Sequence, residues 1–331
     1  MKKLTVALIL SLLATAAHAQ QANTPLTKVR MAYDGFSMTS APLYYATQQG
    51  LFKKFGLDVN PIHIEGGSTL TQALVGGSID IAQNGYTPVA AAAIQGADVV
   101  FIGGMSNKLP FQLVVKNAIT NAQQLKGGKI AISRFGSSTD TAADFALRHL
   151  GLTRNEVSVL QLGGAATRMA AAISGQIEGT MEQQPDTAEL SRHGYHVLVD
   201  VTEIAGDYPN TSYATTRAYL KKNPDAIKRY FMAMATAIHE YKRNPDLAVK
   251  LTAKFLNVKD EANARSAYQS YVNVYPPNLQ VSLKGIDLVL KAIGKKEPKA
   301  AAFKPEQLVD TSVLDGLERE GFFKKLAASR N

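Results

Sequence analysis

The stretch that decides the fold is Gly66-Gly67-Ser68, a short helical segment, and then Gly77-Ser78-Ile79-Asp80-Ile81-Ala82, because the chain contains it in two copies. The second copy reads Gly163-Gly164-Ala165, a similar segment, and then Gly175-Gln176-Ile177-Glu178-Gly179-Thr180. Paired glycines let the backbone turn sharply after a strand, because no Cβ atom stands in the way. A glycine after the last helical turn favours a left-handed cap. Each copy therefore predicts a strand, a helix and a second strand.

The segments between the glycines have the apolar spacing of a helix, with apolar residues three and four positions apart. These residues are Leu70, Ala73 and Leu74 in the first copy, and Met169, Ala172 and Ile173 in the second. We interpret the copies as one unit in each of two related lobes, with helix N-termini directed at a shared ligand. The alternative is an ordinary α/β protein, which contains several such units without any lobe symmetry.

The N-terminus has the pattern of a secretory signal peptide over residues 1–19. Lys2 and Lys3 precede an apolar run over residues 4–17, and Ala17-His18-Ala19 is a small-x-small cleavage site. The run is too short to span a membrane, and no later stretch is long and apolar enough to do so. We therefore expect export to the periplasm, cleavage after Ala19 and a soluble mature protein.

Composition narrows the classes of function. The chain has no cysteine, which excludes disulfides, thiolate metal sites and a lipid-modified N-terminal cysteine. The net charge of +9 comes from scattered basic pairs such as Lys53-Lys54 and Lys221-Lys222, with no basic run. We interpret them as solvated surface and expect no nucleic-acid partner. The positive field could help to steer anions to the protein.

Alternating strands and helices after Lys28 predict mainly parallel sheets covered by helices. The expected strands span residues 29–33, 59–64, 79–83, 99–102, 111–115, 129–133, 157–162, 177–182 and 196–201. After Thr216 the pattern is almost entirely helical, with Asn-Pro-Asp helix starts at Asn223 and Asn244. A chain that enters lobe two near residues 109–113 must return, and residues 207–213 are the best candidate. The two crossings would form a hinge.

In its motifs the chain resembles the periplasmic substrate-binding proteins of ABC importers, in the nitrate, sulfonate and taurine group. The likeness lies in Ala41-Pro42-Leu43-Tyr44-Tyr45-Ala46, the first glycine repeat, Leu125-Lys126-Gly127-Gly128-Lys129, and Asn223-Pro224-Asp225 with its helix. The resemblance implies a type II two-lobed binding-protein fold, with the ligand in the cleft. With the two crossings above, we expect lobe one over residues 27–110, lobe two over 111–210, and a return to lobe one with C-terminal helices over 211–331. The resemblance also implies a permease partner and a monomer.

Ligands of open α/β sheets bind at the carboxyl ends of strands. The loop over residues 136–139 is the best candidate, because free N–H groups at a helix start attract an anion and hydroxyls add donors; an ordinary N-cap is the alternative. The resembled family uses this loop. Arg134 could pair with an acid or simply lie at the surface, and we expect Arg168 to face solvent. The candidate ligand-binding residues are Ser37, Ser40, Gly67, Ser68, Asn84, Tyr86, Arg134, Gly136, Ser137, Ser138, Thr139, Gln184 and Tyr213.

We expect a small polar, anionic ligand, a sulfonate or carboxylate, and no cofactor, metal or catalytic residue. The family often has an aromatic residue and prolines after the strand at residues 177–182, whereas this chain has Gln183-Gln184-Pro185, whose amides favour a polar ligand. One alternative is a neutral heterocycle such as a thiamine pyrimidine precursor, although no clear aromatic pair is evident. A pyrimidine-synthesis enzyme is disfavoured because cysteine is absent, and a periplasmic sensor partner stays possible from the sequence.

Overall fold

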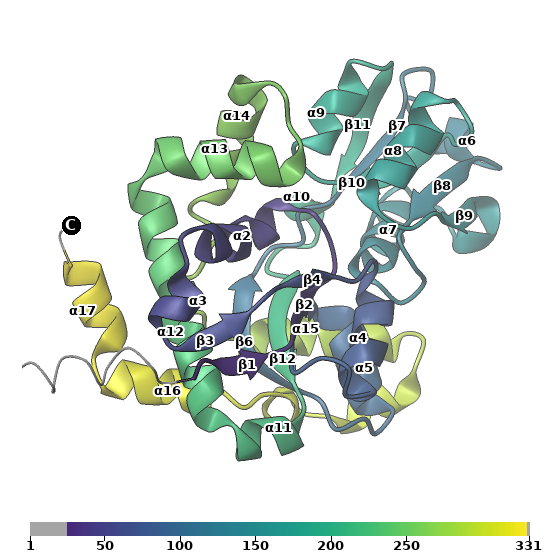
Figure 1. Cartoon of the computed structure of the whole chain (residues 1–331). Coiled ribbons are helices and arrows are strands. Elements are labelled where there is room, and N and C mark those ends of the chain that lie inside the picture. The colour runs from purple at the N-terminus through teal and green to yellow at the C-terminus, as the bar shows by residue number, and fades with distance from the viewer. Residues whose placement is uncertain (1–24, 330–331) are drawn as a thin grey trace, which may run out of the picture.

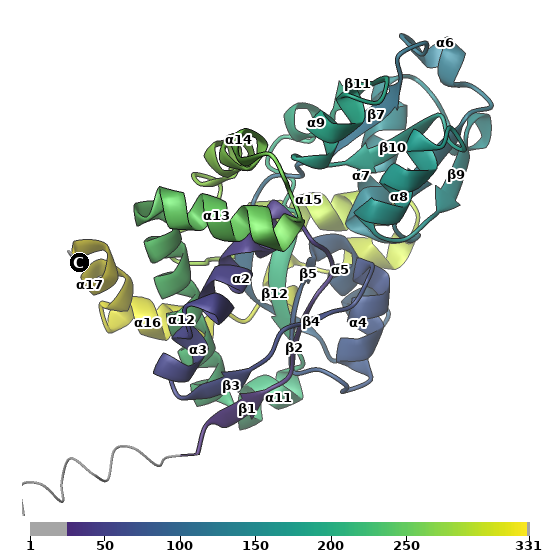
Figure 2. The same ribbon diagram turned by 45° about the horizontal axis from the view of Figure 1, so that its top comes forward.

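Two five-stranded sheets form the centres of two lobes in the computed structural model, which describes residues 25–329 (Figure 1). The second view separates the lobes clearly, with the teal lobe beyond the purple, blue, green and yellow parts (Figure 2). The signal peptide expected at residues 1–19 lies outside the described residues. Over residues 25–329, the structure has no helix of the length and apolarity that a membrane crossing requires.

Lobe one contains a sheet with the strand order β4-β2-β5-β12-β6. A small parallel pair, β1 and β3, extends it at the N-terminal side (Figure 1). The strands are β1 (Thr27–Val29), β2 (Met31–Tyr33), β3 (Leu57–Val59), β4 (Ile62–His63), β5 (Ile81–Gly85), β6 (Val100–Ser106) and β12 (Thr211–Thr215). The helices within this first part are α2 (Ala41–Gln48), α3 (Leu51–Lys54), α4 (Gly67–Val75) and α5 (Tyr86–Ile94), with the 3-10 turn η2 (Met38–Ser40).

Lobe two contains a sheet with the order β11-β7-β10-β8-β9. Its strands are β7 (Gln112–Lys116), β8 (Lys129–Ile132), β9 (Ser158–Gln161), β10 (Gly179–Glu182) and β11 (Tyr195–Asp200). Its helical elements are α6 (Ala122–Leu125), α7 (Ser138–His149), η3 (Arg154–Glu156), α8 (Ala165–Ile173), α9 (Asp186–Ser191) and α10 (Val201–Ile204).

Each sheet has one strand that runs against the other four. In lobe one this strand is β12, antiparallel to β5 and β6. In lobe two it is β7, antiparallel to β10 and β11. Both reversed strands directly follow a crossing from the other lobe, so they enter their sheet at the cleft edge, where the other strands end. The prediction of mainly parallel sheets is confirmed, and the crossings explain the exceptions.

The two crossings lie side by side and form the hinge. The backbone N–H of Asn210 donates to the carbonyl of Ser106 at 3.0 Å, which joins the end of β6 to the start of β12. Beside it, the Lys108 ammonium lies 3.2 Å from the Asp207 carboxylate. Because the two crossing segments are bonded to each other, they can bend as one unit when the lobes move. The hinge supports the lobe boundaries that we propose at residues 110 and 210.

The predicted helical C-terminal part packs on lobe one. Pro224 and Pro245 stand at the first position of their helices, where the missing N–H has no helical partner to lose. Helix α12 lies against α2 and α3, and α15 covers α5 on another side (Figure 1). The elements of this part are α11 (Arg217–Lys222), α12 (Pro224–Arg243), α13 (Pro245–Leu256), α14 (Glu261–Tyr271), α15 (Leu283–Gly294), η4 (Pro298–Ala302), η5 (Pro305–Leu308), α16 (Ser312–Arg319) and α17 (Phe322–Ala328).

The repeat forms one unit in each lobe. The units are β4-α4-β5 and β9-α8-β10, as the glycine spacing predicts. The glycines that precede the helices, Gly66 and Gly163, have φ angles of 86° and 80°. Those that follow the helices, Gly77 and Gly175, have φ angles of 72° and 76°. These left-handed conformations are strained for any residue with a Cβ atom, which explains why glycine occupies all four positions.

Candidate functional site

A cavity of about 1100 Å³ lies between the lobes. Lobe one contributes the loop after β2 and the start of α4, and lobe two contributes the starts of α7, α8 and α9. A third wall comes from the connection between α13 and α14, over residues 255–260 and Asn263. The cavity therefore lies at the carboxyl ends of the strands, as expected for an open α/β sheet.

The start of α7 combines helix N–H groups with hydroxyls. Ser137 is its N-cap, and its Oγ accepts from the Asp140 N–H. The Ser137 Oγ also lies 2.9 Å from the hydroxyl oxygens of Ser133 and Thr139, so three hydroxyls support one another. Among the described residues, the N–H groups of Ser138 and Thr139 have no protein acceptor. Both residues line the cavity, so their N–H groups are available to an anionic ligand group.

The predicted site residues divide into two sets. Ser40, Ser68 and Asn84 do not line the cavity and bond to the protein instead. The Ser40 Oγ bonds to the Gly35 carbonyl, and the Ser68 Oγ donates across the cleft to the Phe135 carbonyl at 2.9 Å. The Asn84 amide donates to the Gly67 carbonyl and fixes the start of α4. The residues that do line the cavity are Ser37, Gly67, Ser137, Ser138, Thr139 and Gln184.

The remaining predicted site residues also lie outside the cavity lining. Tyr86 and Tyr213 are fully buried in the hydrophobic cores of lobe one. Arg134 is exposed, and its side chain passes over Gly66 where that glycine has no Cβ. The Gly136 N–H donates to the Asp140 carboxylate at 2.9 Å, so this donor is already used by a protein anion. The positions of these four residues therefore do not support a contact with the ligand.

The expectation that Arg168 faces solvent is wrong. Its side chain is only 5% exposed, and it pairs with the Glu182 carboxylate at 2.8 and 3.0 Å. It also donates to the Gly163 carbonyl at 2.6 Å, which ties the start of α8 to the end of β10. Arg168 lines the cavity, but its donors are engaged by the protein. We interpret it as a residue that positions two loops of the site.

Carboxylates that the sequence did not single out line the cavity. Burial raises the pKa of Asp34 to about 6. Burial, with the nearby Glu182 carboxylate adding to it, raises the pKa of Asp186 to about 7. Glu65 reaches across the cleft, where its carboxylate accepts the N–H of Gly164. These groups follow strands, but no local sequence pattern distinguishes them from surface acids.

An aromatic wall forms one side of the cavity. Phe36 follows β2, and its ring centroid lies 4.5 Å from that of His63 and 5.3 Å from that of Phe255. Tyr44 stacks on the outer side of Phe255 at 5.0 Å. The pKa of His63 is lowered by burial, which favours the neutral ring. No local sequence pattern predicts this wall, because Phe255 comes from a helix about 200 positions later in the chain.

Two contacts join the C-terminal helices to lobe two. The Tyr271 hydroxyl donates to the Gln183 side-chain oxygen at 3.1 Å. The Arg192 guanidinium lies 3.3 Å from the Asp260 carboxylate. Gln183 belongs to the Gln183-Gln184-Pro185 segment after β10, whose amides favour a polar ligand. Both contacts cross the cleft, so the lobes are close together in this structure.

Comparisons with known proteins agree with this architecture. The family described as NMT1/THI5 like matches residues 37–248. The chain belongs to this family. Its sequence is 29% identical over 221 residues to the taurine-binding periplasmic protein of Escherichia coli strain K12, which covers 65% of this chain and 68% of that protein.

Solved structures show the same fold for the NMT1/THI5-like chain. A protein from Bordetella bronchiseptica RB50 has a TM-score of 0.80 at 25% identity, over 89% of this chain and 98% of that one. The alkanesulfonate-binding protein of Xanthomonas axonopodis pv. citri, bound to MOPS, has a TM-score of 0.69 at 21% identity, over 86% and 96% of the two chains. The resemblance to ABC-importer binding proteins is confirmed.

The NMT1/THI5-like chain is therefore a solute-binding protein of the ABC-importer type. Its relatives are binding proteins and not enzymes, which confirms the prediction that it has no catalytic role. Among residues 25–329, no three His, Asp or Glu side chains are grouped so that they could hold a metal ion. The cavity between the lobes, of about 1100 Å³, is much larger than a second pocket of about 210 Å³ beside Tyr44 and Phe255.

Proposed function

We propose that the protein captures a small polar solute with a sulfonate or carboxylate group, and delivers it to an ABC permease in the inner membrane. The observation that carries this proposal is the start of α7. Ser138 and Thr139 line the cavity beside three mutually bonded hydroxyls, and within residues 25–329 their N–H groups have no protein acceptor. The relative from Escherichia coli is named for taurine, which carries a sulfonate.

The physical basis is the partial positive charge at a helix N-terminus. Helix α7 has 12 residues, long enough for its aligned peptide dipoles to favour an anion at the first turn. Closure of the lobes removes water from this site, which strengthens each hydrogen bond to the anion. The solute shifts the open–closed equilibrium by as much as its affinities for the two forms differ. The permease would then recognise the closed form.

The cell compartment and the state of the mature chain belong to the same proposal. Relatives of this chain are periplasmic binding proteins. We propose that residues 1–19 direct export, that cleavage follows Ala19, and that the mature chain works as a monomer in the periplasm. Mass spectrometry of the periplasmic protein would show an N-terminus at Gln20.

Calorimetry and thermal unfolding of residues 20–331 test the ligand class. The panel contains alkanesulfonates, nitrate, aliphatic carboxylates and a thiamine pyrimidine. A sulfonate or carboxylate at a hundred times its Kd should stabilise the fold by about 2.7 kcal/mol. The double variant Ser137→Ala and Ser138→Ala should lose part of this stabilisation, because it removes two hydroxyls and the N-cap but keeps the backbone N–H groups. Binding of the pyrimidine alone, with every acid inactive, would overturn the proposal.

The matched control is Ser282→Ala. Ser282 is the N-cap of α15, where its side chain accepts from the Gly285 N–H, and it lies outside the cavity. This variant loses a helix cap, as Ser137→Ala does, which costs about 1 kcal/mol of stability. Its affinity for the solute should be that of the wild type. The comparison separates a lost cap from a lost ligand contact.

A further inference from the structure

The cavity has a surplus of carboxylates, although the whole chain carries a net charge of +9. Three cationic side chains line it: Arg168, Arg192 and Lys259. Six acidic side chains line it: Asp34, Glu65, Glu182, Asp186, Glu189 and Asp260. A ligand with negative charge alone would meet repulsion from this lining. The surplus points to a positive charge on the part of the ligand that lies away from α7.

Most of these charges already have partners. Arg168 is paired with Glu182, and Arg192 lies within 3.3 Å of both Glu189 and Asp260. The Glu65 carboxylate accepts the Gly164 N–H. Among the described residues, Asp34 and Asp186 form no ion pair, and of the two only Asp186 lies near a cationic group, that of Arg168. Asp34 is thus the acid in the cavity that most lacks a counter-charge.

The Asp34 carboxylate has a defined place in the site. It follows β2, and its Oδ2 lies 3.4 Å from the point where a Cβ of Gly67 would stand. It also lies beside the backbone N–H of Gly85, and burial raises its pKa to about 6. At neutral pH the group is therefore mostly ionised, in a place where ionisation is costly without a cation. A cationic ligand group would lower that cost.

Aromatic rings line the same cavity as Asp34. Phe36 is two residues further along, lines the cavity and is 51% exposed. His63, 4.5 Å away between ring centroids, contributes a second ring face. The face of an aromatic ring carries negative charge density and attracts a cation. Exposed apolar rings also favour the alkyl or cyclic substituents of an organic amine.

The acid-binding start of α7 and Asp34 adjoin the same residue. The Ser138 Oγ fills the space that a Cβ of Gly85 would occupy, and Asp34 lies beside the Gly85 N–H. We infer that Asp34, with the ring faces of Phe36 and His63, forms a subsite for a protonated amine, so that the solute is a small zwitterion. Its acidic group binds at α7 and its ammonium binds at Asp34. This inference rests on the proposed function for its acidic half only.

Matched ligand pairs test the amine subsite by calorimetry on residues 20–331. Taurine and ethanesulfonate differ only in the amine, as do β-alanine and propionate, and cyclohexylamine supplies an amine without an acid. The wild type should bind the amine-bearing member of a pair at least tenfold more tightly. Asp34→Asn should abolish that preference by weakening the binding of taurine, while ethanesulfonate should bind as tightly as before or more tightly, because a repelling charge is removed. Asp58→Asn makes the same charge change in β3, outside the cavity, and should keep the preference.

A second variant covers the case in which Asp34→Asn does not fold. Phe36→Leu removes an exposed ring and keeps an apolar side chain, and it should lower the preference for the amine several-fold. Equal binding of both members of each pair, or a preference that survives Asp34→Asn, would overturn the amine subsite alone. Binding of cyclohexylamine that depends on Asp34, with every acid inactive, would support the subsite and overturn the proposed function. A panel in which no compound binds would overturn both.

Discussion

The carboxylate of Glu65 in lobe one accepts a hydrogen bond from the backbone N–H of Gly164 in lobe two, with 2.5 Å between oxygen and nitrogen. Gly164 is the N-cap of α8, so the Glu65 charge lies at the positive end of that helix. The contact joins the two glycine repeats, because Glu65 directly precedes Gly66. It exists only while the lobes are together. We therefore expect it to favour the closed form.

Gly163→Ala should weaken ligand binding about tenfold or more. A Cβ at Gly163 would overlap the Glu65 carboxylate, and its φ of 80° is strained for alanine. The overlap occurs only in the closed form, so closure, and with it affinity, bears the cost. Calorimetry with the solute found in the panel measures this loss. In a Glu65→Ala background, the effect of Gly163→Ala on affinity should largely disappear.

Gly175→Ala is the matched control for this prediction. Gly175 ends the helix of the same repeat, its φ is 76°, and within residues 25–329 a Cβ there would have no neighbour within 4 Å. Both alanine variants should lose about 1 to 2 kcal/mol of stability from the left-handed backbone. Only Gly163→Ala should lose affinity. Equal affinities in the two variants would show that Glu65 does not contribute to closure.

The elements that local sequence signals specify were predictable. The glycine repeat fixes β4-α4-β5 and β9-α8-β10, and Asn-Pro-Asp fixes the starts of α12 and α13. The hinge followed from topology, because helices after two α/β blocks require a return crossing. In α4 the predicted apolar residues Leu70 and Leu74 are fully buried. There one face of the helix meets the core, so periodicity identifies it correctly.

In α8 the apolar spacing predicts the helix but does not mark one buried face. Met169 and Ile173 belong to that spacing, yet Ile173 is 47% exposed and both residues line the cavity. The buried residues are Arg168, Ala171 and Ala172. A helix between a core and a ligand cavity has apolar residues on two faces, so hydrophobic spacing does not distinguish them. Arg168 of α8 is buried because Glu182, at the end of β10, neutralises it, and such a pairing between two elements has no local signal.

The aromatic wall was the part of the candidate site least accessible to sequence reasoning. Ser137, Ser138 and Thr139 could be singled out because a helix start with hydroxyls has a local pattern, and all three line the cavity. Phe36 and Phe255 meet only after the chain has folded through both lobes and returned. Their contact depends on how α13 packs on lobe one, and no spacing along the chain encodes that.

Asp186→Asn should change the pH dependence of stability. The pKa of Asp186 rises from 3.8 to about 7 because burial disfavours the charged form. The folded state then binds more protons than the unfolded state between about pH 4 and pH 7, so this group makes stability fall as pH rises across that window. Each pKa unit corresponds to roughly 1.4 kcal/mol, so the full effect is a few kcal/mol.

Urea denaturation from pH 4 to pH 8 measures this effect. Asp186→Asn should be more stable than the wild type at pH 8, and the difference should vanish near pH 4. Asp58→Asn, which makes the same substitution away from the cavity, should follow the wild-type profile. Asp34 contributes in the same direction, with a pKa of about 6, so some slope should persist in Asp186→Asn. Parallel profiles for Asp186→Asn and the wild type would contradict the prediction.

Arg168→Met should destabilise the fold by about 3 to 5 kcal/mol, because it leaves the buried Glu182 carboxylate without a counter-charge. Glu182 is 1% exposed, and besides Arg168 it accepts the Thr180 hydroxyl at 2.7 Å. Arg168→Met combined with Glu182→Leu removes both charges and should recover much of the loss. Urea denaturation of the two variants measures the difference. Equal losses in the single and double variants would show that the charge pair is not the cause.

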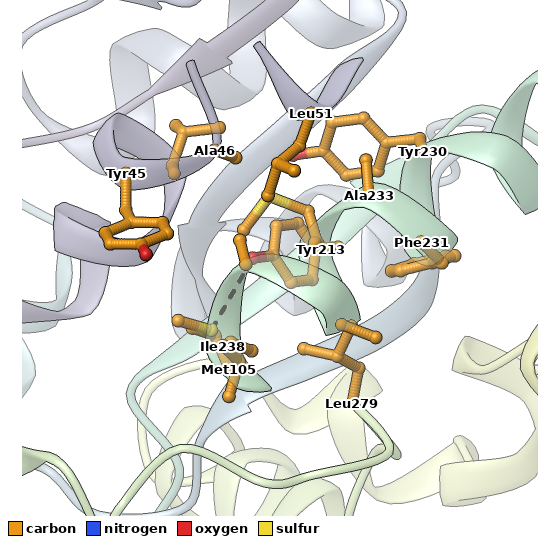
Figure 3. Close-up of a cluster of buried hydrophobic side chains, with 14 of the residues drawn as sticks. Tyr45, Ala46, Leu51, Met105, Tyr213, Tyr230, Phe231, Ala233, Ile238 and Leu279 are labelled. Atoms are coloured by element: carbon orange, nitrogen blue, oxygen red, sulfur yellow. Dashed lines mark hydrogen bonds between the residues drawn. The ribbon is translucent and has the colours of Figure 1, made fainter. Parts of the chain in front are cut away.

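Tyr213→Phe should leave ligand affinity unchanged, although the sequence places Tyr213 among the site residues. Tyr213 is fully buried between the sheet of lobe one and α12, and its hydroxyl bonds to the Met105 sulfur at 3.5 Å (Figure 3). This weak bond should make the cost to stability less than about 1 kcal/mol.

Tyr230→Phe is the control in the same cluster. Its hydroxyl is buried without a hydrogen-bond partner among the described residues, so its removal should be neutral or stabilising. Tyr213→Ala should instead lose about 3 to 5 kcal/mol, because it leaves a cavity in the core. A loss of affinity in Tyr213→Phe but not in Tyr230→Phe, measured by calorimetry, would assign the Tyr213 hydroxyl to the ligand site after all.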